Sequence, residues 1–110
     1  MTTKFKTLTA SSVANGSYSE LEWTPDRDIT IKKMLVNERS GTDLYNVQLY
    51  ITISDVPYTR DYVPAEVIGK NPEYCWKPDL RVPKGAKIYV KVSNNSGSTI
   101  SLDVIFEFEE

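Results

Sequence analysis

Residues 44–53 decide the fold class of this chain, and they read Leu44-Tyr45-Asn46-Val47-Gln48-Leu49-Tyr50-Ile51-Thr52-Ile53. Apolar or aromatic side chains fill every second position of this stretch. A period of two that is kept over ten residues is typical of a β-strand that buries one face. We therefore predict a strand here, and its inward face is expected to carry Tyr45, Val47, Leu49, Ile51 and Ile53.

A second β-rich run precedes this strand at residues 29–36. Its apolar residues change parity, because the two isoleucines at its start share one face whereas Met34 and Val36 share the other. A β-bulge near Lys32-Lys33 would produce this shift. The alternative is that both faces of the strand are covered where the parity changes. We favour the bulge.

Two hairpins are predicted towards the ends of the chain. The dipeptide Asn15-Gly16 separates strands at residues 7–14 and 17–23, and it suits the positive φ angles of a type I′ turn. The second hairpin joins residues 87–92 to residues 99–108, and apolar side chains alternate with more polar ones along it. The residues expected to face inward are Leu21, Trp23, Ile88, Val90, Val92, Ile100, Leu102, Val104, Phe106 and Phe108.

Residues 55–83 form the least regular part of the sequence. Five of the six prolines and Gly69 fall here, so no long strand or helix can run through it. One short helical turn is predicted at residues 64–69, and short strand pieces are predicted at residues 73–76 and 79–82. A segment of this length between strands usually crosses the end of a sandwich and can carry function.

These elements predict an all-β fold in a single domain that spans residues 1–110. About seven or eight antiparallel strands with short polar turns settle as two packed sheets. We therefore expect an antiparallel β-sandwich of the jelly-roll type. Residues 1–6 are a candidate for a flexible arm.

The composition gives no sign of a nucleic-acid or membrane partner. Thirteen basic and fifteen acidic residues leave a formal charge of −2, so no attraction to phosphate backbones or anionic lipids is expected. The first residues are too polar for a signal peptide, and no apolar run approaches the length of a membrane span. We therefore expect a protein that is made in a cytoplasm.

Enzymatic and metal chemistry is also disfavoured. The chain has no histidine, which removes the usual general base near neutral pH and the commonest metal ligand. The single cysteine, Cys75, allows no internal disulfide and is expected to be a small buried side chain. The closest carboxylate pairs, Asp26/Asp28 and Asp55/Asp61, lie in turns, where aspartate commonly bonds to the backbone. Calcium suits loop carboxylates, but no ordered Asp-x-Asp-x-Asp loop is present. We predict no enzyme, no cofactor and no metal site.

Two sets of side chains are candidates for binding. The first consists of apolar or aromatic residues on outward strand faces, which would contact another subunit. The second consists of aromatic residues in or beside the irregular segment, which would stack on sugar rings unless they only fill or cover the core. The interface set contains Leu35, Tyr50, Tyr89 and Ile105, and the ligand set contains Tyr58, Tyr62 and Trp76.

Three segments carry a resemblance to a known kind of protein. They are Glu-Trp-Thr-Pro-Asp at residues 22–26, Ile-Thr-Ile-Lys-Lys at residues 29–33, and Val-Pro-Lys-Gly-Ala-Lys-Ile-Tyr-Val at residues 82–90. Together with the final strands, this pattern resembles small jelly-roll structural proteins of viruses and phages, of the capsid, decoration or spike-base type. The similarity covers most of the chain as a pattern of strands and turns.

The resemblance implies a non-enzymatic structural protein of the virion, synthesised in the host cytoplasm. Such a subunit self-associates, with a trimer as the favoured homo-oligomer, and contacts other virion proteins. The arm at residues 1–6 would then reach a neighbouring subunit. A Pro-x-Gly approach to a strand also occurs in carbohydrate-binding jelly rolls. The alternative function is therefore a carbohydrate-binding module that uses the loop aromatics to hold a glycan.

Overall fold

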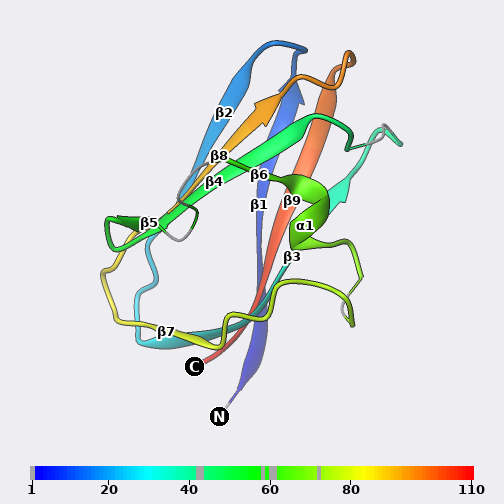
Figure 1. The fold of residues 1–110 in the computed structure, drawn as a ribbon. Coiled ribbons are helices and arrows are strands. Elements are labelled where there is room, and N and C mark those ends of the chain that lie inside the picture. The colour runs from blue at the N-terminus through cyan, green and yellow to red at the C-terminus, as the bar shows by residue number, and fades with distance from the viewer. Residues whose placement is uncertain (1, 42–43, 58, 60–61, 72) are drawn as a thin grey trace.

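The computed structural model describes residues 2–41, 44–57, 59, 62–71 and 73–110. Two antiparallel sheets pack against each other (Figure 1), so the prediction of an antiparallel β-sandwich is confirmed. The β9 sheet contains, in spatial order, β1 (Thr3–Val13), β9 (Ile100–Glu109), β3 (Ile29–Glu38) and β7 (Leu80–Val82). The β8 sheet contains β2 (Tyr18–Trp23), β8 (Ile88–Asn94), β4 (Val47–Ile53) and β5 (Val56–Pro57), with β6 (Val63–Pro64) also paired to β4.

The strand order is that of a jelly roll. The chain passes from one sheet to the other at most of its connections, so β1, β3, β7 and β9 share one sheet while β2, β4 and β8 share the other. β8 covers one edge of β4 along its whole length, so β5 and β6 both lie on the other edge. Counting β5 and β6 as one position gives, for the described residues, eight strands in two four-stranded sheets, which is the jelly-roll architecture.

The two predicted hairpins are wrong. β1 pairs with β9 and β2 pairs with β8, although the turn at Asn15-Gly16 joins β1 directly to β2. Likewise β8 and β9 lie in different sheets. Of the turn dipeptide, only Gly16 has a positive φ, 82°, so the turn is not type I′. Two consecutive strands with one apolar face each can bury those faces either as neighbours in one sheet or as members of two facing sheets. In this chain, β1 and β2 lie in facing sheets, and so do β8 and β9.

A tight hairpin does occur between β4 and β5. Ser54 and Asp55 have φ angles of 55° and 62°, the two successive positive values of a type I′ turn. Further along the same edge of β4, the hydroxyl of Thr59 accepts a hydrogen bond from the Ile51 N–H at 3.1 Å. That bond falls between the parts of the β4 edge that β5 and β6 cover, and it satisfies a buried backbone donor.

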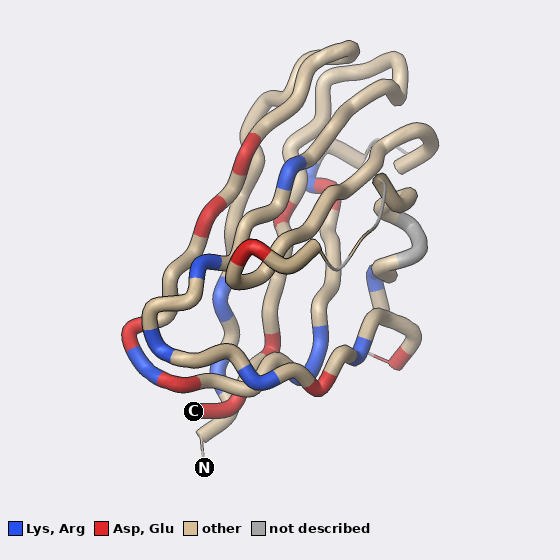
Figure 2. Tube along the Cα trace, turned by 60° about the vertical axis from the view of Figure 1, so that its left-hand side comes forward, with Lys and Arg blue, Asp and Glu red and all other residues tan. Residues whose placement is uncertain are grey.

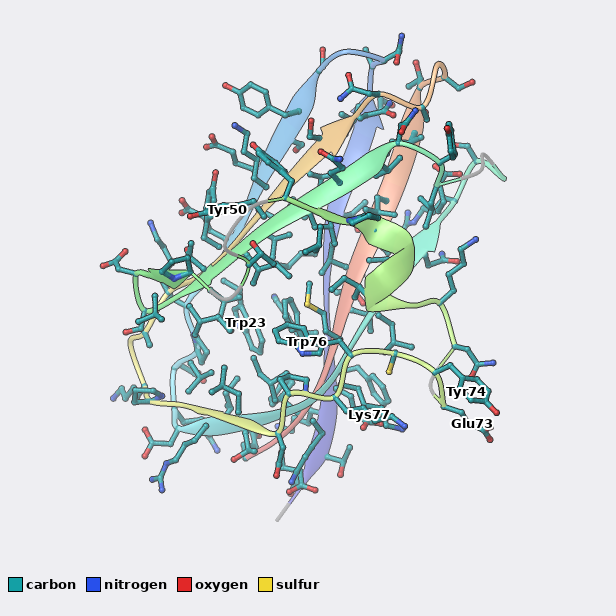
Figure 3. All side chains as sticks on the ribbon, viewed as in Figure 1. Trp23, Tyr50, Glu73, Tyr74, Trp76 and Lys77 are labelled. Carbon is teal, nitrogen blue, oxygen red and sulfur yellow. The ribbon has the colours of Figure 1, made fainter. Side chains whose placement is uncertain are left out.

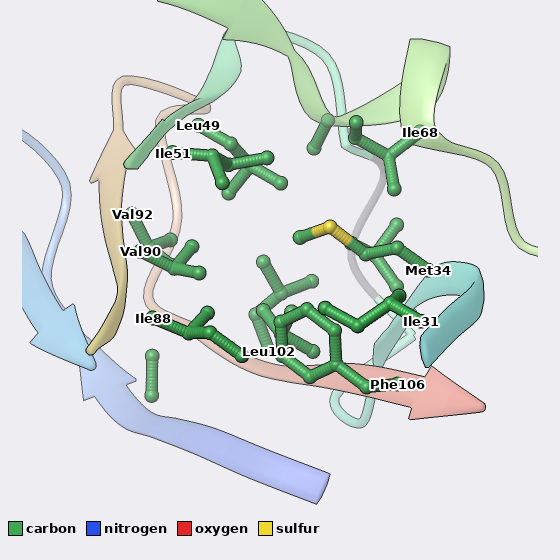
Figure 4. Close-up of a cluster of buried hydrophobic side chains, with 14 of the residues drawn as sticks. Ile31, Met34, Leu49, Ile51, Ile68, Ile88, Val90, Val92, Leu102 and Phe106 are labelled. Atoms are coloured by element: carbon green, nitrogen blue, oxygen red, sulfur yellow. The ribbon is translucent and has the colours of Figure 1, made fainter. Parts of the chain in front are cut away.

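The core is built from alternate side chains of the facing sheets (Figure 4). The inward faces of β4, β8 and β9 agree with the predicted alternation, and their apolar side chains are at most 6% exposed. Tyr45 is the exception, because β4 begins only at Val47 and the Tyr45 side chain is 70% exposed. At one end of the core, the ring of Trp23 lies 5.7 Å from that of Phe106 and 5.1 Å from that of Phe108.

The predicted bulge in β3 is confirmed. The pairing of β3 with β9 shifts register between Ile31 and Lys33, which changes the parity of the apolar residues. Met34 and Val36 then face the core, and Leu35 points to the outer face of the sheet. Leu35 is nonetheless buried, at 8% exposure, so both faces of the strand are covered at this point.

After the one-turn helix α1 (Ala65–Ile68), a short segment pairs with β3 further along the same edge that β7 covers. The N–H of Val36 donates to the carbonyl of Gly69 at 3.0 Å, and the N–H of Met34 donates to the carbonyl of Trp76 at 2.9 Å. The prediction of a helical turn and short strand pieces in this region therefore agrees with the fold. The bridge between Trp76 and Met34 places both side chains on the core side of the sheet.

The two chain ends lie together at one end of the sandwich (Figure 2). Residues 1–6 were a candidate arm, but pairing begins at Thr3, and Thr2 and Glu110 exchange backbone hydrogen bonds. Charged residues gather towards this end, whereas the loops at the opposite end are almost free of charge in the described chain. Lys4 and Lys6 lie on the core-side face of the edge strand β1, where lysine discourages pairing with a foreign strand.

One finding bears on membranes. No helix in the part of the chain that the structure describes is long and apolar enough to cross a bilayer.

Gly69 is the position where the fold tolerates no side chain. Its φ of 100° and ψ of 153° belong to a region that only glycine occupies readily. A Cβ there would lie 2.3 Å from the carbonyl oxygen of Tyr74 and 2.8 Å from the Cα of Cys75. Both atoms are backbone and cannot rotate away.

We predict that Gly69→Ala lowers the free energy of unfolding by roughly 3–4 kcal/mol, from left-handed backbone strain together with forced displacement of the neighbouring chain. Gly16→Ala is the matched control, because Gly16 also has positive φ but no atom lies within 4 Å of its added Cβ. The control should cost only the backbone strain, about 1–2 kcal/mol. Urea unfolding of both variants measures the difference, and equal losses would contradict the steric explanation.

Candidate functional site

The sandwich presents two outer faces, one on each sheet, and each can be described as three rows across three strands. On the β8 sheet, the register aligns outward residues of β2, β8 and β4. On the β9 sheet, the register aligns outward residues of β1, β9 and β3. The rows of the first face are Glu22/Tyr89/Thr52, Glu20/Lys91/Tyr50 and Tyr18/Ser93/Gln48. The rows of the second are Phe5/Glu107/Lys33, Thr7/Ile105/Leu35 and Thr9/Asp103/Asn37.

We call the first of these surfaces, with Tyr62 added, the tyrosine face. Tyr62 precedes β6, and its ring centre lies 5.8 Å from that of Tyr50 at an interplanar angle of 47°. The Lys91 ammonium lies 4.2 Å from the centre of the Tyr18 ring and 5.8 Å from that of Tyr62, which is cation–π geometry. Four tyrosines from four separate stretches of sequence therefore surround one lysine.

The polar groups of the tyrosine face are bonded to one another. A hydrogen bond with Tyr62 raises the pKa of Lys91 above its ordinary value and thereby favours the charged ammonium. Burial raises the pKa of Tyr89, and the charge of Glu20 and a hydrogen bond to it act in the same direction. Tyr89 is therefore a neutral donor to the Glu20 carboxylate. The face offers aromatic surface together with charged donors and acceptors.

The second surface has an apolar centre, which we call the apolar strip and define as Phe5, Ile105 and Leu35. Leu35 is directly opposite Ile105 in the ladder, and Phe5 on β1 is a diagonal neighbour of Ile105. Exposure rises along the strip, because Leu35 is buried, Ile105 is half-buried and Phe5 is 65% exposed. The three side chains thus form one apolar strip on the outward face of the β9 sheet.

A buried carboxylate borders the apolar strip. Asp103 is 5% exposed, and its oxygens accept hydrogen bonds from Thr9 Oγ1 at 2.8 Å, Arg39 Nε at 2.9 Å and Asn37 Nδ2 at 3.2 Å. Burial alone would raise the pKa of Asp103, but the bonds from Arg39, Thr9 and Asn37 outweigh it and hold the pKa below its ordinary value. The carboxylate thus ties β1, β9 and β3 together.

Of the turn carboxylates that sequence singled out, Asp28 is engaged structurally. Asp28 accepts the backbone N–H of Lys84 at 2.8 Å and lies 3.5 Å from the Arg81 guanidinium. That backbone bond is the main cause that lowers the pKa of Asp28, with Arg81 acting in the same direction. Asp28 and Arg81 also line a shallow pocket of about 230 Å³ beside the C-terminus. Asp61 lies outside the described residues.

The predicted interface residues do not form one surface. Tyr50 and Tyr89 lie on the tyrosine face, whereas Leu35 and Ile105 lie on the opposite face of the sandwich. Their outward parity is as predicted. The two pairs belong to different sheets because β4 and β8 share one sheet and β3 and β9 share the other.

The predicted ligand platform is not assembled as a unit. Tyr62 joins the tyrosine face, whereas Trp76 packs against the core between the sheets (Figure 3). Tyr58 lies outside the described residues. Sequence reasoning overlooked Tyr18 and Lys91, whose parity along β2 and β8 could have found them.

Comparison of the chain with protein-family models, with curated proteins and with solved structures found no match.

The Asp103 network predicts a defined loss of stability. Asp103→Asn should lower the free energy of unfolding at neutral pH by on the order of 2 kcal/mol, because the charge-assisted bonds from Thr9, Asn37 and Arg39 are lost. Asp26→Asn is the matched control, since the Asp26 side chain is 93% exposed and its nearest cation, Arg27, is 3.9 Å away. The control should change stability by less than about 0.5 kcal/mol.

The same network predicts how this difference depends on pH. The folded pKa of Asp103 is depressed, so its contribution is complete above the unfolded pKa of about 3.9 and is lost as the pH falls through the lower folded value. Urea unfolding should therefore show that the difference in free energy of unfolding between the native protein and Asp103→Asn becomes smaller as the solution is acidified. If that difference in free energy stayed constant from neutral to strongly acidic pH, the stabilising role of the charged Asp103 carboxylate would be contradicted.

Proposed function

We propose that this chain is a non-enzymatic structural subunit that associates with further copies of itself through the outer face of its β9 sheet. The observation that carries the proposal is the exposed Phe5 ring, held on a paired strand beside Ile105. Because both residues sit on a rigid sheet, burying them costs little conformational entropy.

The composition of this face suits a protein contact. Its centre is hydrocarbon, while the flanking rows carry charges that are already paired, Lys33 with Glu107 at 4.0 Å and Arg39 with Asp103 at 2.9 Å. An apolar centre with a polar rim is the usual anatomy of an interface. A stable contact needs roughly 800 Å² per partner, and the rows around the strip extend across β1, β9 and β3.

The absence of enzymatic activity is part of the proposal. The sequence contains no histidine, and Asp28 and Asp103 are engaged by donors that fix them as charged structural groups. In the described residues no three histidine, cysteine, aspartate or glutamate side chains cluster in a way that could hold a metal ion.

We extend the proposal to a virion component, made in the host cytoplasm and in contact with other virion proteins. Jelly rolls occur in viral capsid proteins and also in lectins, so the fold supports this assignment by analogy alone. A face that meets its own copy gives a dimer, whereas a face that meets a different surface of the next copy gives a ring such as the favoured trimer.

Replacing Ile105 with Asp should dissociate the assembly without unfolding the protomer. Burial of an aliphatic side chain contributes on the order of 1.5–3 kcal/mol, so the dissociation constant should rise by a factor of about 10 to 10² at each contact of a ring. A symmetric dimer contact contains the side chain twice, so there the factor should be about 10² or more. Light scattering on a size-exclusion column measures the mass, and circular dichroism checks the fold.

The matched control is Thr52→Asp, which places the same charge at a half-buried outward position of the opposite sheet. This control should leave the mass unchanged. A native protein that is monomeric at high concentration, or an Ile105→Asp variant with the native mass, would overturn the proposed contact.

A further inference from the structure

We infer that the tyrosine face is a binding site for a neutral carbohydrate. It lies on the outer surface of the β8 sheet, on the opposite side of the sandwich from the apolar strip. The site therefore does not depend on the proposed self-association, and a subunit joined through its β9 sheet still presents the tyrosines to solvent.

The first argument is the geometry of the exposed rings. Tyr18 is 59% exposed and Tyr62 is 39% exposed. Because Lys91 Nζ lies 4.2 Å from one ring centre and 5.8 Å from the other, the two centres are at most 10.0 Å apart. A short run of sugar rings can span that separation and lay its C–H faces on both aromatic faces.

The rings are also held in place before a ligand arrives. Tyr62 packs against the ring of Tyr50 and hydrogen-bonds to Lys91, and the Lys91 ammonium lies over the ring of Tyr18. All of these residues except Tyr62 stand on paired strands. A pre-ordered surface loses little side-chain entropy on binding. This low cost favours a ligand such as a sugar, which gains little free energy from each contact.

The second argument is the mixture of donors and acceptors among the rings. Lys91 supplies N–H donors, Glu20 supplies carboxylate acceptors, and Gln48 at the edge of the face supplies both. Sugar hydroxyls both donate and accept, so they can bond to this mixed set while the sugar ring stacks on tyrosine.

The balance of charge points to a neutral ligand. Lys91 is directly opposite Glu20 in the ladder, and Lys87 Nζ lies 3.4 Å from Glu22 Oε1. Among the residues that the structure describes, these two cations near the face are thus matched by two carboxylates. A phosphate, a nucleic acid or an acidic polysaccharide would gain little long-range attraction here.

The same residues make a protein partner less suitable for this face. Lysine and glutamate are depleted from the cores of protein interfaces, because burying them costs more than their contacts return. Here Lys91 occupies the centre of the face, with Glu20 beside it. The apolar strip on the other sheet has hydrocarbon in the corresponding position.

The test is a titration monitored by NMR of protein labelled with ¹³C in its tyrosine rings. The probes are neutral hexaoses of glucose, mannose, xylose and N-acetylglucosamine, with an alginate oligosaccharide as the acidic comparison. At least one neutral hexaose should shift the ring signals of Tyr18 and Tyr62 while those of Tyr45 and Tyr74 stay in place. The affinity should be insensitive to an increase of about tenfold in salt, because no net charge is involved.

Variants connect the signal to the residues. Tyr18→Ala and Tyr62→Ala should each weaken binding about tenfold or more, the loss of one stacked ring. Tyr45→Ala and Tyr74→Ala are the matched controls, because these tyrosines are 70% and 78% exposed but lie off the face. Ile105→Asp should retain sugar binding, which separates this test from that of the self-association.

Four results would overturn the inference. They are a flat titration with every neutral hexaose, binding of the acidic oligosaccharide alone, equal losses in the control variants, and a change of native mass in Tyr18→Ala, which would make the face a protein contact.

Discussion

The structure depends on the burial of alternate side chains between two facing sheets. Every long strand of the core gives one face to the interior, and at about 25 cal/mol per Å² of apolar surface this burial dominates the stability of the fold. The same alternation leaves the other face of each strand outside. A jelly roll of this size therefore has two broad outer surfaces, and the chemistry of those surfaces is what distinguishes one such protein from another.

The two outer faces have the same geometry but opposite composition. On the β9 sheet, Ile105 occupies the middle position, and the nearby carboxylate of Asp103 is enclosed by donors from its own sheet. On the β8 sheet, Lys91 occupies the middle position, and tyrosine rings surround it. The first arrangement hides charge around an apolar centre, as a protein contact requires. The second exposes charge among aromatic rings, as a polar ligand requires.

The sequence predicts the strands and their inward faces well, because burial imposes a period of two that local residues reveal. It predicts the partners of those strands poorly. The turns at Asn15-Gly16 and at residues 95–99 are compatible both with a hairpin and with a crossing to the opposite sheet, and only contacts between distant strands decide the matter. The same limit applies to the sites. The parity of Tyr50, Tyr89 and Ile105 could be read from the sequence, but their assignment to opposite faces required the order of the strands.

We propose that copies of this chain meet through the β9 sheet and not through the β8 sheet. A dilution series followed by amide and methyl NMR tests this proposal directly, because signals at a self-contact depend on protein concentration whereas signals elsewhere do not. We expect the signals of Phe5, Thr7 and Ile105 to change on dilution and those of Tyr18, Tyr62 and Lys91 to stay constant. The proposed contact would be contradicted if only signals of the tyrosine face changed with protein concentration, or if no signal on either face changed.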